Sequence, residues 1–347
     1  MDEFITLAHG AGGRQTSDLI GGLFKKYFAN ENLTEDDAAV VKFPPADFNN
    51  GDSAAQGNAD LVMTTDGFIV SPQEFNGGNI GKLSICGTVN DLACMGAKPL
   101  YLTCAFVIEE GFPFSKLEKI AEAMGKTAKE AGVQIIAGDT KVTGKGQVDG
   151  IFITTTGVGL RLNGVKTGGS LAKPGDAVIV TGNIGQHGCC ILIERNEFGI
   201  NADVKSDCAP LCNSVLGLLN DTKDVHVIRD ATRGGVGTVL YEIAEQSKTG
   251  IKLFQDKVPV SPEVKGVCGM LGLEPLYLAC EGRLVIFAPK ENAENILASL
   301  KKQKYTEDSC IIGEVVSENP GRVIVETEIG SKTMLPPPGG ELLPRIC

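Results

Sequence analysis

The sequence ends on a cysteine, Cys347, in the segment ELLPRIC, and the segment PPPGG lies directly before it. Chain ends are usually the most mobile part of a protein. Three prolines and two glycines indicate a semi-rigid strut followed by a joint. The eight residues from Gly340 to Cys347 could extend over about 25 Å. A thiol on such an arm could move between solvent and a pocket, and the alternative is a disordered end without a role.

Aspartates recur between small residues at positions that look like strand ends or helix interiors. Acidic residues seldom occupy tight apolar settings unless they are paired or bound to a metal. Several such carboxylates could converge on Mg²⁺, which takes oxygen ligands and often bridges to phosphates. For any one of them alone, a helix cap or an Asx turn is the better interpretation. The positions are Asp36 and Asp37 in DDAAV, Asp66 in TTDG, Asp91 in VNDLA, Asp139 in AGDT and Asp230 in RDATRGG.

Two glycine-rich segments precede helical patterns. The segment HGAGGR contains Gly10, Gly12 and Gly13, and DATRGGVG offers Arg233 beside its glycines. Backbone N–H groups at a helix N-terminus suit phosphate oxygens. Neither segment has the spacing of a P-loop or of a dinucleotide fingerprint, so each signal is weak alone.

Composition excludes several classes of protein. The net charge of −11 argues against nucleic acid as the main partner, because no basic excess can neutralise phosphates. No apolar run is long enough to cross a membrane, and the N-terminus lacks a signal peptide. We therefore expect a cytoplasmic protein with reduced cysteines. Ten of the eleven cysteines lie in the body of the chain, where we expect them to act as small hydrophobic residues.

Alternating strand and helix patterns predict an α/β fold with two domains, residues 1–165 and 166–330, and a mobile tail at 331–347. The first domain should hold strands at ADLVMTTDGFIV, PLYLTCAFVIEE, VQIIAGD and DGIFITTTGVGL, and a helix that ends at Gly132. LAKPGDAVIVTG should open the second domain through a turn at Pro174 and Gly175. Its helices are expected near 207–220, 234–248, 261–271 and 291–302, and its strands near 225–229, 251–254, 283–288 and 310–315.

Taken together, these segments resemble a known family. HGAGG, DDAAV, TTDG, GTVNDLACMGAKP, AGDTKV, DATRGG, ACEGR and the terminal PRIC are similar to the hydrogenase maturation factors of the HypE family. That family belongs to the ATP-binding superfamily of aminoimidazole ribonucleotide synthetase, selenophosphate synthetase and thiamine monophosphate kinase. The resemblance runs in order over nearly the whole chain. Cys94 stands where an apolar residue would serve equally well.

The resemblance implies an ATP-dependent carbamoyl dehydratase. A carbamoyltransferase, HypF, would load a carbamoyl group onto Cys347, and ATP would drive its dehydration to a thiocyanate. The cyano group would then pass through a HypC–HypD complex to the iron of nickel–iron hydrogenase. The fold implied is that of aminoimidazole ribonucleotide synthetase, whose N-terminal domain binds ATP and pairs in a homodimer.

The resemblance also implies roles for single residues. Cys347 would carry the substrate, Glu281 in ACEGR would be the base, and Lys141 in GDTKV would stabilise charge that develops on oxygen. From the residues alone, Lys141 reads as a surface lysine and Glu281 as the ion-pair partner of Arg283. Mg²⁺ would be bound by Asp37, Asp91 and Asp230, and ATP by Gly10, Gly12, Gly13, Asp66, Asp139 and Arg233.

Three alternatives remain. Another kinase or synthetase of the superfamily would act on a small free substrate, without a need for Cys347. A non-enzymatic adaptor would explain the tail but leave the dispersed aspartates without a purpose. A prenyl anchor requires its cysteine fourth from the end, whereas here it is the last residue. ATP turnover separates the first two, because an adaptor has none.

Overall fold

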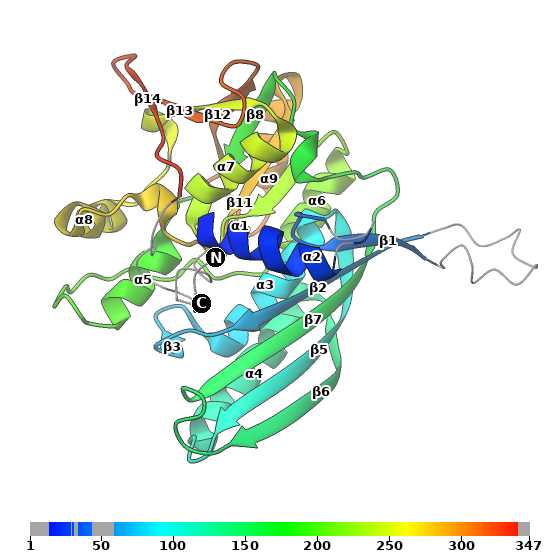
Figure 1. Cartoon of the computed structure of the whole chain (residues 1–347), viewed down its shortest axis with the longest axis vertical. Helices are drawn as coiled ribbons and strands as arrows, with labels where there is room; N and C mark the ends of the chain where they lie inside the picture. Colours follow the sequence, from blue (N-terminus) through cyan, green and yellow to red (C-terminus); the bar gives the residue numbers. More distant parts are fainter. Residues whose placement is uncertain (1–13, 29, 31–33, 44–58, 339–347) are drawn as a thin grey trace, which may run out of the picture.

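The structure is a computed structural model that describes residues 14–28, 30, 34–43 and 59–338 (Figure 1). The predicted glycine loop with Gly10, Gly12 and Gly13 and the predicted substrate carrier Cys347 lie outside the described residues.

A five-stranded sheet forms the first half of the chain. Its order is β1-β2-β7-β5-β6, with β5 and β6 parallel and the other neighbours antiparallel. The strands are β1 (Ala39–Phe43), β2 (Ala59–Phe68), β5 (Ala97–Glu109), β6 (Gln134–Thr143) and β7 (Ile151–Arg161). Helices α3 (Ile80–Cys94) and α4 (Phe114–Ala131) lie along one face of this sheet (Figure 1).

The other face of this sheet carries exposed apolar side chains. Met63 and Tyr101 both pair with Val158 of the strand between them, so they lie in one row. Because side chains alternate between the faces of a strand, Met63 and Tyr101 project to the same side, where they are 41% and 45% exposed. This face therefore lacks a covering layer within the described part of the chain.

The second half contains a seven-stranded sheet of order β14-β13-β10-β12-β8-β11-β9. The strands are β8 (Asp176–Val180), β9 (Val227–Asp230), β10 (Gly250–Phe254), β11 (Leu284–Pro289), β12 (Cys310–Val316), β13 (Val323–Glu326) and β14 (Lys332–Met334). The helices are α5 (Gln186–Glu194), α6 (Cys212–Asp221), α7 (Gly235–Ser247), α8 (Pro262–Leu271) and α9 (Ala293–Leu300).

Both faces of the second sheet are buried, as the unbroken apolar sequence of its central strand requires. In β8, Val178 and Val180 pack in the cluster that contains α7, while Ala177 and Ile179 pack in the cluster that contains α6 and α9. The second cluster continues into α3 and α4 of the first half. One core therefore joins the two halves.

The remaining elements are short. The helical segment near the N-terminus comprises α1 (Arg14–Leu19), a π-helical turn (Ile20–Phe24) and α2 (Lys25–Phe28), and β3 (Glu74–Phe75) and β4 (Gly78–Asn79) form a small hairpin. Short 3₁₀ helices span Gly169–Leu171, Gln255–Lys257, Pro275–Tyr277 and Lys290–Asn292.

The predicted α/β class and the helix that ends at Gly132 are confirmed, since Gly132 caps α4 with a left-handed φ of 75°. All ten body cysteines are free, and nine of them are buried, which confirms their expected apolar role. The sequence pattern was lost from residue 331, yet β14 pairs with β13 there and Leu335 is buried. The three side chains of β14 are exposed, so the hydrophobic pattern of the sequence did not predict this strand.

Candidate functional site

Four predicted aspartates come together from separate elements. Asp37 precedes β1, Asp66 lies on β2, Asp91 on α3 and Asp230 at the end of β9. The Thr64 hydroxyl, which lies 2.9 Å from Asp91 Oδ2, also donates to the carbonyl of Asp37 at 3.2 Å. The charges of Asp230, Asp37 and Asp66 all act on Asp91. We name these four residues the acidic cluster.

The acidic cluster holds its protons unusually tightly. Burial raises the pKa of Asp37 to about 6, although Arg229 opposes the shift. Burial, reinforced by the charges of the other members, also raises the pKa values of Asp91 and Asp230 well above their ordinary range. Partial desolvation raises the pKa of Asp66, although this residue is exposed, and Arg233 opposes the shift. Like charges gathered at a half-buried site disfavour joint ionisation, so a cation would be stabilised here.

Arg229 is a cation that contacts the acidic cluster, and the sequence analysis did not identify it. Its Nε lies 2.6 Å from Asp37 Oδ1, and its Nη2 lies 2.8 Å from Glu242 Oε2. Its Nη1 donates to the carbonyl of Glu35 at 3.0 Å. Arg229 therefore joins β9 and α7 of the second half to the segment before β1. Its position directly before Asp230 was the available signal.

Glycines allow close approach around the cluster. A Cβ on Gly87 would lie 2.8 Å from the Phe68 ring and 3.5 Å from Asp66 Oδ2. Gly235, at the start of α7, has a φ of +61°, and a Cβ there would meet the Leu278 carbonyl at 2.5 Å. Glycine is thus required at both positions, and Gly235 lets α7 begin beside Arg233.

Glu281 is buried next to this cluster. Burial raises its pKa well above the ordinary range, and the charges of Cys208, Asp230, Asp207 and Asp66 add to the shift. Its backbone N–H donates to Asp207 Oδ1 at 3.0 Å.

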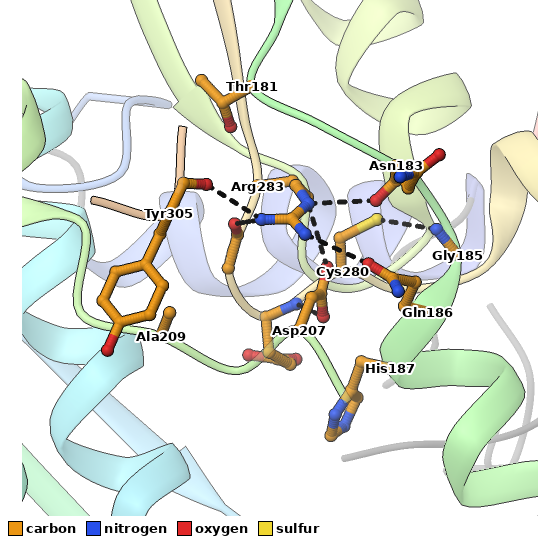
Figure 2. A network of polar contacts seen from close by, with 12 residues as sticks. Thr181, Asn183, Gly185, Gln186, His187, Asp207, Ala209, Cys280, Arg283 and Tyr305 are labelled. Atoms are coloured by element: carbon orange, nitrogen blue, oxygen red, sulfur yellow. Dashed lines mark hydrogen bonds and ion pairs between the residues drawn. The ribbon is translucent and has the colours of Figure 1, made fainter. Parts of the chain in front are cut away.

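The segment ACEGR by itself suggests an ion pair between Glu281 and Arg283. In the structure, Arg283 lies beside Asp207 instead. Its Nε lies 3.8 Å from Asp207 Oδ2 and donates to the Asn183 carbonyl, and its Nη atoms donate to Gln186 Oε1 and the Tyr305 carbonyl (Figure 2). Asp207 and these carbonyl oxygens therefore supply the partners of Arg283, which fixes the loop that carries Glu281.

Asp139 and Lys141 are not brought to the cluster. They lie on β6, both exposed, with Lys141 Nζ 3.0 Å from Asp139 Oδ2. The row that starts at Asp66 crosses β7 and β5 and ends on β6 beside Asp139. Three strand spacings separate the two backbones by about 14 Å.

The cluster suits an oxygen-seeking cation. Asp37 Oδ2 is buried without a hydrogen-bond partner, and carboxylates are ligands that Mg²⁺ prefers. Among the residues that the structure describes, no three acidic, His or Cys side chains are gathered closely enough to hold a metal by themselves. A magnesium ion here would take its other ligands from water and phosphates, as it usually does. No helix in the described residues is long and apolar enough to cross a membrane.

Comparisons with known proteins agree over the whole chain. The model for the N-terminal domain of AIR synthase related proteins matches residues 35–161, and that for their C-terminal domain matches residues 173–326. Carbamoyl dehydratase HypE of Rhodobacter capsulatus is 41% identical over 346 residues, which cover 100% of this chain and 99% of that protein.

Solved structures agree as well. A crystal structure of a HypE–HypF complex has a TM-score of 0.84 at 42% identity, covering 92% of this chain and 99% of that chain. HypE in complex with ATP has a TM-score of 0.80 at 42% identity, covering 99% and 100%. This chain therefore belongs to the HypE family of carbamoyl dehydratases, within the AIR synthase related proteins.

Proposed function

We propose that this chain uses ATP to dehydrate a carbamoyl group on Cys347 to a thiocyanate, which supplies the cyanide ligand for the iron of nickel–iron hydrogenase. The observation that carries the proposal is the acidic cluster with buried Glu281 beside it, in a chain similar to HypE proteins along its whole length. The alternative is a superfamily enzyme that phosphorylates a small free substrate.

ATP is the expected nucleotide because a HypE of 42% identity has been solved with ATP. We assign its phosphates to Asp66, Arg233 and the glycine loop of Gly10, Gly12 and Gly13. Asp37, Asp91 and Asp230 would hold Mg²⁺, whose positive charge would offset their mutual repulsion and the charge of the phosphates.

The reaction begins when the carbamoyl oxygen attacks the γ-phosphorus of ATP and the bond to the β-phosphate oxygen breaks. ADP leaves, and one N–H proton passes to solvent water, which gives an O-phosphorylated imidate. Glu281 then takes the second N–H proton while the C–O bond breaks and phosphate departs, which leaves S–C≡N. Burial raises the pKa of Glu281, and a carboxylate that binds a proton more tightly than usual is a stronger base once it is ionised.

We also propose a homodimer. The uncovered face of the first sheet carries exposed apolar side chains, including Met63 and Tyr101, and large exposed apolar patches mark association sites. Asp139 and Lys141 lie on the edge strand β6, about 14 Å from the cluster of their own chain by strand spacing. In a pair formed through this sheet, they would be available to the cluster of the second copy, where ATP binding by Asp139 and charge stabilisation by Lys141 are expected.

Further assignments follow from the family. A HypF carbamoyltransferase would load Cys347, since a HypE–HypF complex is known for a similar protein. A HypC–HypD complex would accept the cyano group. We place the domains at residues 1–165 and 166–330, the first for ATP binding and dimerisation. The tail was expected at 331–347, but β14 and buried Leu335 belong to the second sheet, so we place the start of the tail after them. The free cysteines support a reducing, cytoplasmic setting.

Intact-mass spectrometry tests the proposal. The chain is incubated with the carbamoylating partner, carbamoyl phosphate and ATP, beside Cys347→Ala and beside a non-hydrolysable ATP analogue. Gain of a carbamoyl group on the C-terminal peptide, then loss of water only with hydrolysable ATP, is the expected result. ATP consumption without an adduct on Cys347 would support the alternative enzyme.

A further inference from the structure

The last described residues are fixed to the body of the protein. β14 pairs with β13 through Met334 and Ile324. The Leu335 N–H then donates to the Val323 carbonyl at 2.9 Å, and the Leu335 residue is 4% exposed. The chain is thus fixed to the second sheet as far as Pro336. We name Leu335 and Pro336 the tail root.

Two tyrosine hydroxyls hold the tail root. The Tyr241 hydroxyl donates to the carbonyl of Leu335, and the Tyr277 hydroxyl donates to the carbonyl of Pro336. Burial raises the pKa of both hydroxyls, so both remain protonated donors at neutral pH. Consecutive carbonyls of the tail root are therefore bound by side chains from two different segments.

Both tyrosines are set by helix α7. Tyr241 lies on α7, and the ring of Tyr277 lies against the same helix at Gly237, where a Cβ would approach Tyr277 Cε1 to 2.6 Å. Gly237 and Tyr241 are four residues apart, which places them on one helix face. The glycine in the segment GVG thus makes room for the second tyrosine.

The same helix begins at the acidic cluster. α7 starts at Gly235, directly after the segment with Asp230 and Arg233. Tyr241 is six residues further, which is about 9 Å along a helix. A single rigid element therefore connects the tail root to the start of the predicted phosphate site.

We propose that Tyr241 and Tyr277 are positioning residues that fix the tail root on α7, so that Cys347 is tethered close to the acidic cluster during dehydration. The proposal rests on the function proposed above. The tyrosines act through the tether and do not contact the reacting atoms.

The tether length sets the expected effect. Eleven residues follow Pro336. If the tail root and the short strand β14 detach, the tether begins after Glu326, and twenty-one residues follow it. The local concentration of a tethered group falls roughly as the −3/2 power of tether length, so the loss is about threefold.

The first measurement is the single-turnover rate at which ATP removes water from the carbamoylated tail, in wild type and in the double variant Tyr241→Phe, Tyr277→Phe. Both rings stay, so packing against Gly237 is kept. We expect a rate about threefold lower at saturating ATP, with an unchanged Kd for ATP. Tyr27→Phe is the control, because Tyr27 is 68% exposed on α2. An unchanged rate in the double variant would overturn the proposal.

A second measurement separates positioning from damage to the site. Full-length Cys347→Ala, with and without the two Tyr→Phe changes, receives a synthetic S-carbamoyl peptide of residues 340–347. Equal rates on this free peptide support a tether effect, whereas an equal slowing of free and attached substrate would overturn it.

Hydrogen exchange measures how firmly the tail root is attached, independently of the enzymatic reaction. Faster exchange of the amides of Lys332–Leu335 in the double variant supports the anchor, and unchanged exchange overturns it. A wild-type chain that keeps its tail carbamoylated in ATP would instead refute the proposed dehydration and, with it, the positioning role.

Discussion

Asp230→Asn should make the folded chain more stable near neutral pH and, at the same time, weaken its binding of Mg²⁺ with ATP. Asp230 shares the acidic cluster with Asp37 and Asp66, whose charges, after burial, help to raise its pKa well above the ordinary range. Asparagine keeps the shape of the side chain and cannot ionise. The variant therefore removes the cost of ionising a buried carboxyl beside Asp37 and Asp66, together with its smaller attraction to Arg229.

The sign follows from proton linkage. A carboxyl whose pKa is higher in the folded than in the unfolded state stabilises the fold most below its unfolded pKa, and this stability is lost as pH rises through the folded pKa. Asp37 gives the scale: a rise from 3.8 to about 6 corresponds to about 3 kcal/mol. The pKa of Asp230 is raised by the same leading cause, burial, so Asp230→Asn should be more stable than wild type at pH 7.5.

Urea denaturation at pH 4 and pH 7.5 without divalent cations measures this gain. The variant should differ little from wild type at pH 4, just above the ordinary pKa of 3.8, and should exceed it at pH 7.5. Asp308→Asn, at an exposed site, should change the stability at neither pH. Mg²⁺ with ATP should then stabilise wild type more than Asp230→Asn. A variant that is less stable than wild type at pH 7.5 would refute the reasoning, because it would mean that Asp230 is held ionised by a partner such as Arg229.

Three further changes test the site. Arg229→Met leaves Asp37 and Glu242 without their cation and should lower the unfolding free energy by about 3–5 kcal/mol. The control Arg14→Met, on an exposed helix, should change the unfolding free energy by less than about 0.5 kcal/mol. Denaturant titration measures both values. Glu281→Gln should still accept the carbamoyl group on Cys347 but lose dehydration by about 10²–10⁴-fold, measured by intact mass in a single turnover. Gly282→Ala places a Cβ 1.9 Å from the Asp207 carbonyl and should cost about 1–3 kcal/mol; Gly266→Ala, in open space on α8, should be neutral or stabilising in thermal unfolding.

Local sequence patterns predicted most of the helices and strands. Helix α4 was predictable because its amphipathic repeat and the glycine at its C-terminal end are both local signals in the sequence. The strand β8 was readable as an apolar run because both of its faces are buried. β14 was not, since its three side chains are exposed and its partner β13 is recognisable only from the pairing.

The site was predictable as a list of residues but not as an arrangement. Spacing and flanking residues singled out Asp66 and Asp230, which do meet. The same kind of motif singled out Asp139, but its strand β6 is on the sheet edge, three strands from β2. Strand order is set by long-range pairing, which a single sequence does not display. Arg229 was overlooked because its one signal, the position directly before Asp230, is weak until its carboxylate partners are placed.

Helix α7 links the tail root to the acidic cluster, which suits a site whose substrate is attached to the chain. An enzyme that takes a free substrate needs contacts that bind it, and uniform binding does not accelerate the chemical step. A substrate on a short tether reaches its site at millimolar local concentration without those contacts. The charges of the cluster can then act on the nucleotide and on the departing oxygen. On this reasoning, the two hydroxyls at the tail root matter to catalysis only while Cys347 remains attached, which is why the free peptide is the decisive comparison.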